Sequence, residues 1–476
     1  MAERIQWPFL ANALLGQFLA GLAARSFTIS LPTVASSLGT DILGISWALI
    51  SFQLASVSLS LVFGRLGDLY GRSKLCGLGF VVLATSSFLC GMAQDVVQLI
   101  AFRFLQGIGG AMVQSSARAM AMDAVPPGWE GKAQGFMTVA FHTGFFIGPP
   151  LGGFLIESIG WRAVFFVMVP IGVAGIILSV LGAKRGLGKK LGKQHSSVDY
   201  IGAAMLILLS VVLILLIDHK SAELAGIKQP ALLGVIFAGV LLSFLAYERR
   251  LESPILNTSL FKIKMFSCSI VSLFMLSITR GLVAFLLPFY LQDILGLSPS
   301  FIGLLFLVQP IFTLSLAPVS GHMTDRIGPR VPATLGVLSS MASVLVGLFF
   351  RPDSHWWIPA VMLAFSGAGT ALFNSANQAA VIGSVPPNYR GFATGMVHTG
   401  FELGHMLGVS VGGVLLTVAY QHYSGIPDAT PGPNDPRAFV SSMNVSYVSA
   451  AACCLVALAT SLLRGSGKIH AAKEDN

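Results

Sequence analysis

Charged residues are scarce in this sequence. They make up 10% of its 476 residues, whereas soluble proteins usually carry about 25%. Apolar residues make up 54%. So few charges argue against an ordinary soluble protein and predict a chain that lies largely in a membrane.

Acidic residues are fewer still, with 20 Asp and Glu against 29 Lys and Arg. An excess of positive charge can indicate nucleic-acid binding, but here the basic residues fall in short loops between apolar runs. The sequence lacks the basic stripes interleaved with aromatic residues that bind nucleic acids. We therefore expect no nucleic-acid partner.

The motifs of enzymes and metal sites are also missing. Five cysteines lie inside apolar stretches, without CxxC spacing and without a histidine in ligand register. The sequence contains no HExxH, GxSxG or GxxxxGK[ST] motif, and its longest hydrophilic stretches, 183–198 and 419–444, are too short for a catalytic domain. We expect neither an enzyme nor an ATP-driven pump, and neither a cofactor nor a metal.

Long apolar runs dominate what is present. Runs of about 20 residues, enough to cross a bilayer core of about 30 Å, occur fourteen times. They lie near 8–31, 45–63, 75–93, 98–122, 133–155, 162–182, 199–217, 230–247, 266–290, 301–321, 332–350, 357–382, 392–418 and 445–463. The first run is too long for the apolar part of a signal peptide. The expected fold is an all-α integral membrane protein with 14 transmembrane helices.

The basic residues between these runs predict the orientation. Placing the N-terminus in the cytoplasm puts 20 Lys and Arg on that side and five outside. This asymmetry is what the positive-inside rule requires. Both termini are expected in the cytoplasm, and the membrane is expected to be the plasma membrane.

An internal repeat relates the two ends of the chain. The glycine-rich pattern of residues 107–153 recurs 260 positions later, at 367–413. Three further positions recur at a distance of 257: Gly64, Asp68 and Gly71 match Gly321, Asp325 and Gly328. The repeat predicts two six-helix bundles in the same orientation. We expect an N-terminal bundle at 1–183, a basic linker with two inserted helices at 184–261, and a C-terminal bundle with a short tail at 262–476.

Two motifs carry a resemblance to a known family. The stretch from Gly64 to Lys74 reads GRLGDLYGRSK, and its glycines permit a tight turn. The stretch from Gly144 to Gly153 reads GFFIGPPLGG, whose small residues at spacing four let helices approach closely. With the RFLQGIG pattern that begins at Arg103, the sequence resembles the major facilitator superfamily over essentially its whole length. Fourteen helices place it nearest the drug:proton antiporter branch.

The resemblance implies secondary active transport by alternating access, usually of lipophilic solutes. It also implies two sets of site residues. The residues expected to govern gating are Gly64, Asp68, Gly71, Arg72, Asp123 and Asp325, with Arg72 joined to Asp123 and Asp68 facing a helix N-terminus of the opposite half. The residues expected to pack helices are Gly144, Gly148, Pro149, Gly152 and Gly153. One departure is that the branch commonly has an Asp in the middle of helix 1, where this chain has Arg25.

Arginines inside predicted spans are candidates for solute binding. A charge at mid-bilayer costs about 3 kcal/mol, so it needs a cavity or a partner. Arg25 lies seven residues before Pro32, and Arg280 lies eight before Pro288 in the repeat-related helix. We interpret them as one arginine offered by each half, which would favour an anionic or polar head group. The alternative is that both hold helices together.

Two further arginines have other expected roles. Arg103 matches the family's helix 4 arginine, which is implicated in proton transfer. Arg118 lies near a helix end, where it is expected to reach the membrane surface or to pair with Asp123.

Proton coupling needs a group that changes charge during transport. Glu402 and His142 occupy repeat-equivalent positions, and either could take up and release a proton. We favour Glu402, because no Asp or Glu lies in the middle of helix 1 or helix 4; the alternative is that both only hydrogen-bond between helices. The polar residues expected to line a central cavity are Gln53, Gln114, Gln309 and Asn374.

The sequence therefore predicts proton-coupled export of small lipophilic or amphipathic compounds. The alternative function is transport or exchange of an organic anion or lipid head group bound by Arg25 and Arg280. The expected partners are a small-molecule substrate, protons and the lipid bilayer. A monomer is expected, because each chain contains both halves of a pathway.

Overall fold

The computed structural model describes residues 6–126, 129–184, 200–217, 230–248, 258–386, 389–426 and 429–465. In these ranges the secondary structure is helical, without strands. The described chain divides into two compact units, of which unit 1 comprises Met1–Leu216, Ser221–Phe244 and Leu297–Leu304. Unit 2 comprises Ile217–Lys220, Leu245–Gly296 and Leu305–Asn476.

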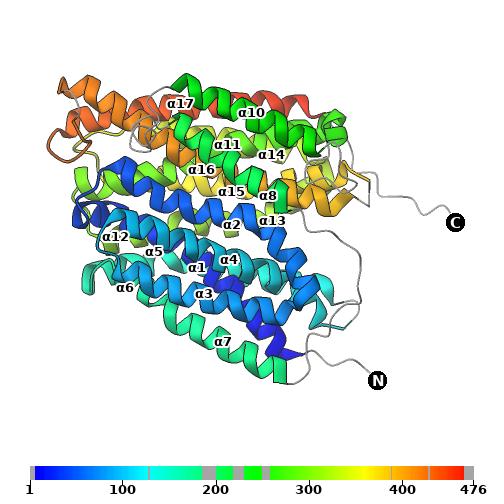
Figure 1. Ribbon diagram of the computed structural model, residues 1–476. Coiled ribbons are helices and arrows are strands. Elements are labelled where there is room, and N and C mark those ends of the chain that lie inside the picture. Colours follow the sequence, from blue (N-terminus) through cyan, green and yellow to red (C-terminus); the bar gives the residue numbers. More distant parts are fainter. Residues whose placement is uncertain are drawn as a thin grey trace. The chain divides into compact units, whose positions relative to one another are not determined.

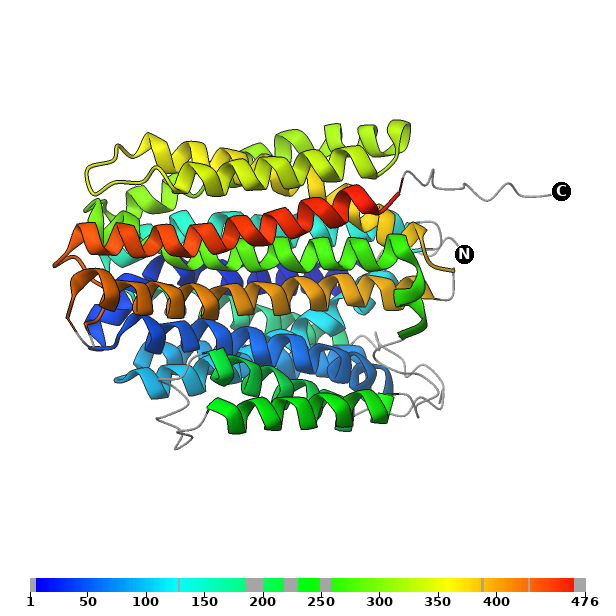
Figure 2. The ribbon, with the colours of Figure 1, turned by 90° about the horizontal axis from the view of Figure 1, so that it is seen from above.

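Ten of the described helices, labelled in Figure 1, belong wholly or mainly to unit 1. They are α1 (Trp7–Ser37), α2 (Ile42–Tyr70), α3 (Arg72–Met92), α4 (Val96–Asp123), α5 (Glu130–Ser158), α6 (Ala163–Phe166), α7 (Met168–Lys184), α8 (Tyr200–Ile217), α10 (Pro230–Glu248) and α12 (Pro299–Leu305). Unit 2 contains the short turns η1 (Thr258–Lys262) and η2 (Tyr290–Ile294), and the helices α11 (Lys264–Phe289), α13 (Val308–Ile327), α14 (Arg330–Gly347), α15 (Trp357–Gly383), α16 (Arg390–Ser424) and α17 (Pro436–Leu463). Within unit 2, α11, α16 and α17 pack side by side (Figure 2).

Twelve candidate spans occur among the described residues. The span Ala163–Leu181 joins α6 to α7, and Pro299–Ile327 joins α12 to α13. The two helices predicted between the halves are present as α8 and α10, but in this region only the shorter apolar stretch Leu232–Phe244 is identified. The presence of fourteen transmembrane helices therefore remains a prediction.

The turn between α2 and α3 is tight, as the glycines of the Gly64–Lys74 stretch permit. The helices extend farther than the expected spans 45–63 and 75–93, because α2 continues to Tyr70 and α3 begins at Arg72. Gly71 alone makes the turn, with φ of 104°, a conformation that favours glycine. Gly328, its repeat equivalent, ends α13 with φ of 81°. The helix continues through Gly64 because, in a membrane protein, intrahelical bonds satisfy the backbone most completely.

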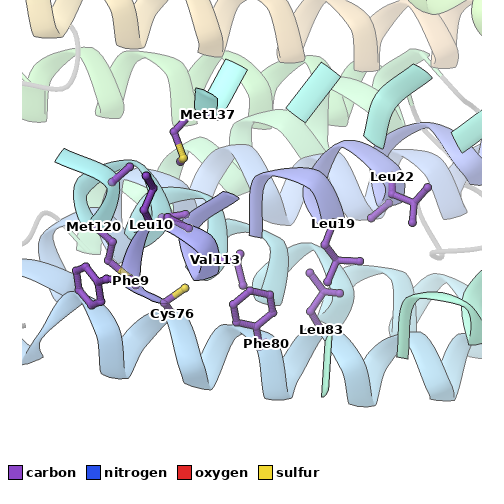
Figure 3. Close-up of a cluster of buried hydrophobic side chains, with 14 of the residues drawn as sticks. Phe9, Leu10, Leu19, Leu22, Cys76, Phe80, Leu83, Val113, Met120 and Met137 are labelled. Carbon is purple, nitrogen blue, oxygen red and sulfur yellow. The ribbon is translucent and has the colours of Figure 1, made fainter. Parts of the chain in front are cut away.

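The apolar core of unit 1 surrounds α1. Helices α4, α5 and α7 pack on α1, and α3 packs on α4 and α7. Phe80 of α3 is fully buried there, and a Cβ on Gly16 of α1 would lie 2.6 Å from Val113 of α4. Figure 3 shows this cluster, with side chains from four helices: Phe9, Leu10, Leu19, Leu22, Cys76, Phe80, Leu83, Val113, Met120 and Met137.

The internal repeat is visible in the helix contacts of each unit. In unit 1, a Cβ on Gly107 of α4 would overlap the carbonyl of Phe52 on α2. In unit 2, a Cβ on Gly367 of α15 would overlap the carbonyl of Gln309 on α13. Gln309 follows Phe52 by 257 positions, the distance seen in the sequence repeat. Matching glycines thus make matching contacts, which confirms the prediction of two related halves.

Candidate transport site

The packing motif of α5 brings its backbone against α1. A Cβ on Gly144 would overlap the carbonyl of Phe18, and one on Gly152 would lie 2.9 Å from the carbonyl oxygen of Ser26. A Cβ on Gly148 would lie 3.1 Å from the nitrogen of Ser26. Pro149 lies within the helix. The small residues therefore permit the close approach that their spacing predicts.

Arg25 lies on α1 beside this seam. Its guanidinium carbon is 4.8 Å from the centroid of the Phe145 ring on α5. Such a contact attracts a cation to the negative face of the ring. Arg25 is therefore held near α5, with its donors along an aromatic surface.

Arg280 lies on α11 and contacts a different helix. Its Nη1 donates to Oδ1 of Asn374 on α15 at 3.1 Å, and the Phe373 ring is 6.0 Å away. Its Nη2 is buried and has no hydrogen-bond partner among the described residues. A buried guanidinium nitrogen without a partner is costly, and an acceptor atom placed beside Nη2 would remove that cost.

The two arginines occupy positions in the repeat that differ by one residue. Gly148 meets Ser26 on α1, and the matching Gly408 meets Leu282 on α11, 256 positions after Ser26. By this register the counterpart of Arg25 is Gly281. One residue turns a helix by about 100°, so Arg25 faces α5 whereas Arg280 faces α15.

Arg103 is fully buried in α4 at the centre of a polar network. Its Nε donates to the carbonyl of Ala48 on α2 at 3.1 Å, and its Nη1 donates to Oε1 of Gln106 at 2.6 Å. Its guanidinium carbon lies 4.7 Å from the ring of Phe27 and 4.4 Å from that of Phe52. The network joins α1, α2 and α4, and these four contacts of Arg103 include no carboxylate.

Glu402 is the carboxylate farthest from the helix ends. It is half-buried on α16, and within the described spans every other Asp or Glu lies within two residues of an end of its helix or span. His142, its repeat equivalent on α5, is exposed and stacks on Phe146, with ring centroids 5.5 Å apart.

The predicted gating residues lie at helix ends. Nη1 of Arg72 is 2.7 Å from Oδ2 of Asp123, which joins the start of α3 to the end of α4. Arg118 is exposed. The side chain of Asp68 lies outside the described part of the structure, whereas Asp325 is exposed near the end of α13.

The other predicted polar residues occupy different places. Gln309 donates to Ser366 at 3.2 Å, and the backbone carbonyl of Gln114 accepts from Gln17 at 3.4 Å. Gln53 is half-buried on α2. Among the described residues, no group of three or more His, Cys, Asp and Glu side chains is placed to hold a metal ion.

Sequence reasoning counted Asn377 among the polar residues within spans, but it missed a cluster of aromatic rings on α5. Asn377 is buried on α15, and neither of its amide atoms has a partner among the described residues. Phe141, Phe145 and Phe146 gather with His142 on α5, where the spacing of four residues within the pairs Phe141–Phe145 and His142–Phe146 indicates one region of a helix surface. That spacing was the available signal for the ring cluster.

The chain belongs to the Major Facilitator Superfamily, whose family model matches residues 13–248 and 269–464. It is a transporter rather than an enzyme. The fold agrees, because a bacterial homologue of the human lysosomal transporter Spinster superposes with a TM-score of 0.66, at 14% identity and with 96% of each chain covered. The peptide transporter POT superposes with a TM-score of 0.67, at 16% identity, over 94% of this chain and 93% of that one.

Curated relatives are transporters with different solutes in their names. The riboflavin transporter RibZ of Clostridioides difficile (strain 630) is 26% identical over 95% of this chain and 96% of its own length. The tetracenomycin C resistance and export protein of Streptomyces glaucescens is 27% identical over 90% of this chain and 79% of its own length. Multidrug resistance protein 3 of Bacillus subtilis (strain 168) is 27% identical over 78% of this chain and 72% of its own length.

Proposed function

We propose that this transporter exports small lipophilic or amphipathic compounds in exchange for protons. The observation that carries the proposal is the position of Glu402, the carboxylate deepest within the described spans. A carboxylate far from both helix ends is costly when charged, so it needs a cavity, a partner or a proton. Glu402 would take up a proton from one side and release it to the other as the two halves alternate.

The export direction and solute class are supported by the relatives. Proteins named for multidrug resistance and for tetracenomycin C export align with most of this chain. The distribution of basic residues in the sequence supports an orientation in the plasma membrane with both termini in the cytoplasm. Each chain contains both halves, so a monomer suffices for transport.

Alternating access requires contacts that form in one state and break in another. Arg72 and Asp123 are suited to this, because the pair is partly exposed, with 21% and 43% of the two side chains accessible. A partly hydrated pair is held weakly. It therefore dissociates at low cost when the ends of α3 and α4 move.

A second candidate function is transport of a solute with an anionic or polar head group. The unpartnered Nη2 of Arg280 and the unpartnered amide of Asn377 favour acceptor and donor groups on the solute. The different registers of Arg25 and Arg280 weaken the idea of a symmetric arginine pair. We therefore rank this function second.

Proteoliposomes with an imposed pH gradient test the proton coupling. We expect Glu402→Gln to lose gradient-driven accumulation of ethidium while ethidium still exchanges across the membrane without a gradient. The matched control is Asp353→Asn, in an exposed loop of the same unit, which should keep both activities. Unchanged gradient-driven accumulation in Glu402→Gln would disprove the assignment of the coupling residue.

A further inference from the structure

Four rings on α5 form a continuous surface, which we call the ring ledge: Phe141, His142, Phe145 and Phe146. The ring centroids of Phe141 and Phe145 are 6.0 Å apart and stacked, as are those of His142 and Phe146 at 5.5 Å. The two pairs meet edge to face, at 5.6 Å and 5.9 Å. The phenylalanine rings are half-buried and His142 is exposed, so part of the aromatic surface is accessible within unit 1.

The ledge carries polar groups that do not suit a lipid-facing surface. The Arg25 guanidinium lies 4.8 Å from the Phe145 ring, and His142 is itself a member of the ledge. A histidine and an arginine inside a span normally face a bundle interior or a water-filled cavity. The polarity of the ledge therefore places it on a hydrated path.

The neighbouring residues of α5 give independent support. Phe146, Pro149 and Gly153 follow His142 at spacings of 4, 7 and 11 residues, which keeps them on one stripe of the helix. At the far end of this stripe, a Cβ on Gly303 of α12 would lie 2.7 Å from the carbonyl oxygen of Pro149, and Ser300 of α12 contacts the Gly153 carbonyl at 3.4 Å. The stripe is thus directed toward protein, whereas Phe154, which is 60% exposed, lies on another face.

The second unit does not repeat the ledge. The matching residues of α16 are Phe401, Glu402, His405 and Met406, and one ring contact joins them, between Phe401 and His405 at 6.1 Å. Helix α5 has four rings and no carboxylate at these positions, whereas α16 has the carboxylate Glu402 but not the four rings. The asymmetry separates a surface suited to stacking from a group suited to carrying a proton.

We propose that the ring ledge binds the flat face of a planar aromatic or heteroaromatic solute, with Arg25 and His142 supplying hydrogen bonds at its rim. Offset stacking and edge-to-face contacts are the geometries that aromatic rings favour. The inference rests on the proposed function, since it names the class of solute that the transporter carries. It adds the three phenylalanines as residues that determine specificity.

Transport of three probes tests this specificity: riboflavin, which is planar and uncharged; ethidium, a planar cation; and tetrapentylammonium, a cation without rings. Phe145→Leu and Phe146→Leu keep an apolar side chain but remove the ring. We expect each to raise the half-saturating concentration of every planar probe that the wild type carries by about two- to tenfold, the range expected for one ring contact. Tetrapentylammonium transport should not change, and the matched control Phe154→Leu should leave all probes unaffected.

A labelling experiment tests the ledge without transport. In a variant with its five cysteines replaced by alanine, His142→Cys should react with a membrane-impermeant maleimide, and Phe154→Cys should not. Riboflavin or ethidium at saturating concentration should slow the labelling of His142→Cys at least threefold, whereas tetrapentylammonium should not slow it.

The outcomes separate the two proposals. Labelling with protection by a planar probe, but no gradient-driven transport of any probe, would support the ledge and overturn proton-coupled export. Gradient-driven transport with equal losses for planar and non-planar probes in Phe145→Leu and Phe146→Leu would overturn the ledge alone. Failure of His142→Cys to react at all would also overturn it.

Discussion

Nη1 of Arg72 lies 2.7 Å from Oδ2 of Asp123, and this contact joins the first residue of α3 to the last residue of α4. The two helices also pack along their lengths, so the ion pair is not needed to hold them together. Its position at the helix ends, where the backbone turns at Gly71, makes it suited to regulate movement rather than to stabilise the fold.

We therefore predict that Arg72→Ala and Asp123→Asn change transport more than stability. A partly exposed ion pair contributes about 0–1 kcal/mol, so the melting temperature in detergent should change little. Transport rates should fall severalfold in each variant. The exchanged variant Arg72→Asp with Asp123→Arg should recover part of the rate, and failure to recover would show that the contact itself is not what matters.

The glycines of α5 provide a test of packing. Gly144→Ala places a methyl group against the carbonyl of Phe18 on α1, and overpacking of this kind costs about 1–3 kcal/mol. The matched control is Gly135→Ala on the same helix, where a Cβ would have no neighbour within 4 Å. Thermal unfolding in detergent should show a lower melting temperature for Gly144→Ala only.

The repeat extends this prediction to unit 2. A Cβ on Gly404 of α16 would lie 2.7 Å from the carbonyl oxygen of Phe274 on α11, whereas one on Gly395 would have no neighbour within 4 Å. Gly404→Ala should therefore lower the melting temperature and Gly395→Ala should not. Equal effects at Gly404 and Gly395 would show that helix propensity, not helix contact, sets the cost.

These contacts indicate what the sequence can and cannot predict. The repeat of Gly107 and Gly367 predicts two related halves, because a glycine that permits a close helix contact is constrained in both copies. The distances of seven and eight residues to Pro32 and Pro288 already contain the one-residue offset between Arg25 and Arg280, but the helix that each arginine contacts could be identified only in the structure. Helix faces depend on packing that a single sequence shows only indirectly.

The ring ledge and the turn at Gly71 illustrate the same limit. Phenylalanines in a membrane span usually face lipid, so the sequence alone does not show that Phe145 and Phe146 belong to a polar region of unit 1. The structure shows it, because Arg25 lies beside the Phe145 ring and α12 contacts α5 farther along the helix. Several glycines in the Gly64–Lys74 stretch permit a tight turn, but the sequence does not show which of them makes it. Only the backbone dihedral angles single out Gly71 as the residue that turns the chain.

The network around Arg103 allows a test of two roles for this residue: a structural role, in which it acts as a brace that holds α2 and α4 together, and a role in proton transfer. Arg103→Lys keeps a positive charge but lacks the geometry to serve both Ala48 and Gln106. If Arg103 is a brace, the variant should lose about 2 kcal/mol or more of stability, because buried polar groups are left without partners. A lower melting temperature with an unchanged pH dependence of residual transport would fit a brace. An unchanged melting temperature with an altered pH dependence would instead favour proton transfer.

The different surroundings of Arg25 and Arg280 predict different effects of removing them. Arg280→Ala takes away a buried donor with an unsatisfied nitrogen and leaves Asn374 without its partner. Transport of solutes rich in acceptor oxygens, such as riboflavin, should therefore weaken by about tenfold. This is the loss expected for one hydrogen bond to a charged group. Arg25→Ala removes the cation beside the Phe145 ring, a contact of about 0.5–1 kcal/mol at accessible sites, together with the donor that the ring ledge proposal assigns to it. It should therefore weaken transport of riboflavin by about tenfold and transport of ethidium by a few-fold. Ethidium, which carries no oxygen, should be transported normally by Arg280→Ala. The transport rates of riboflavin and ethidium should be measured in proteoliposomes for both arginine variants. Equal losses in the two variants for every solute would restore the symmetric arginine pair and with it the anion-transport function.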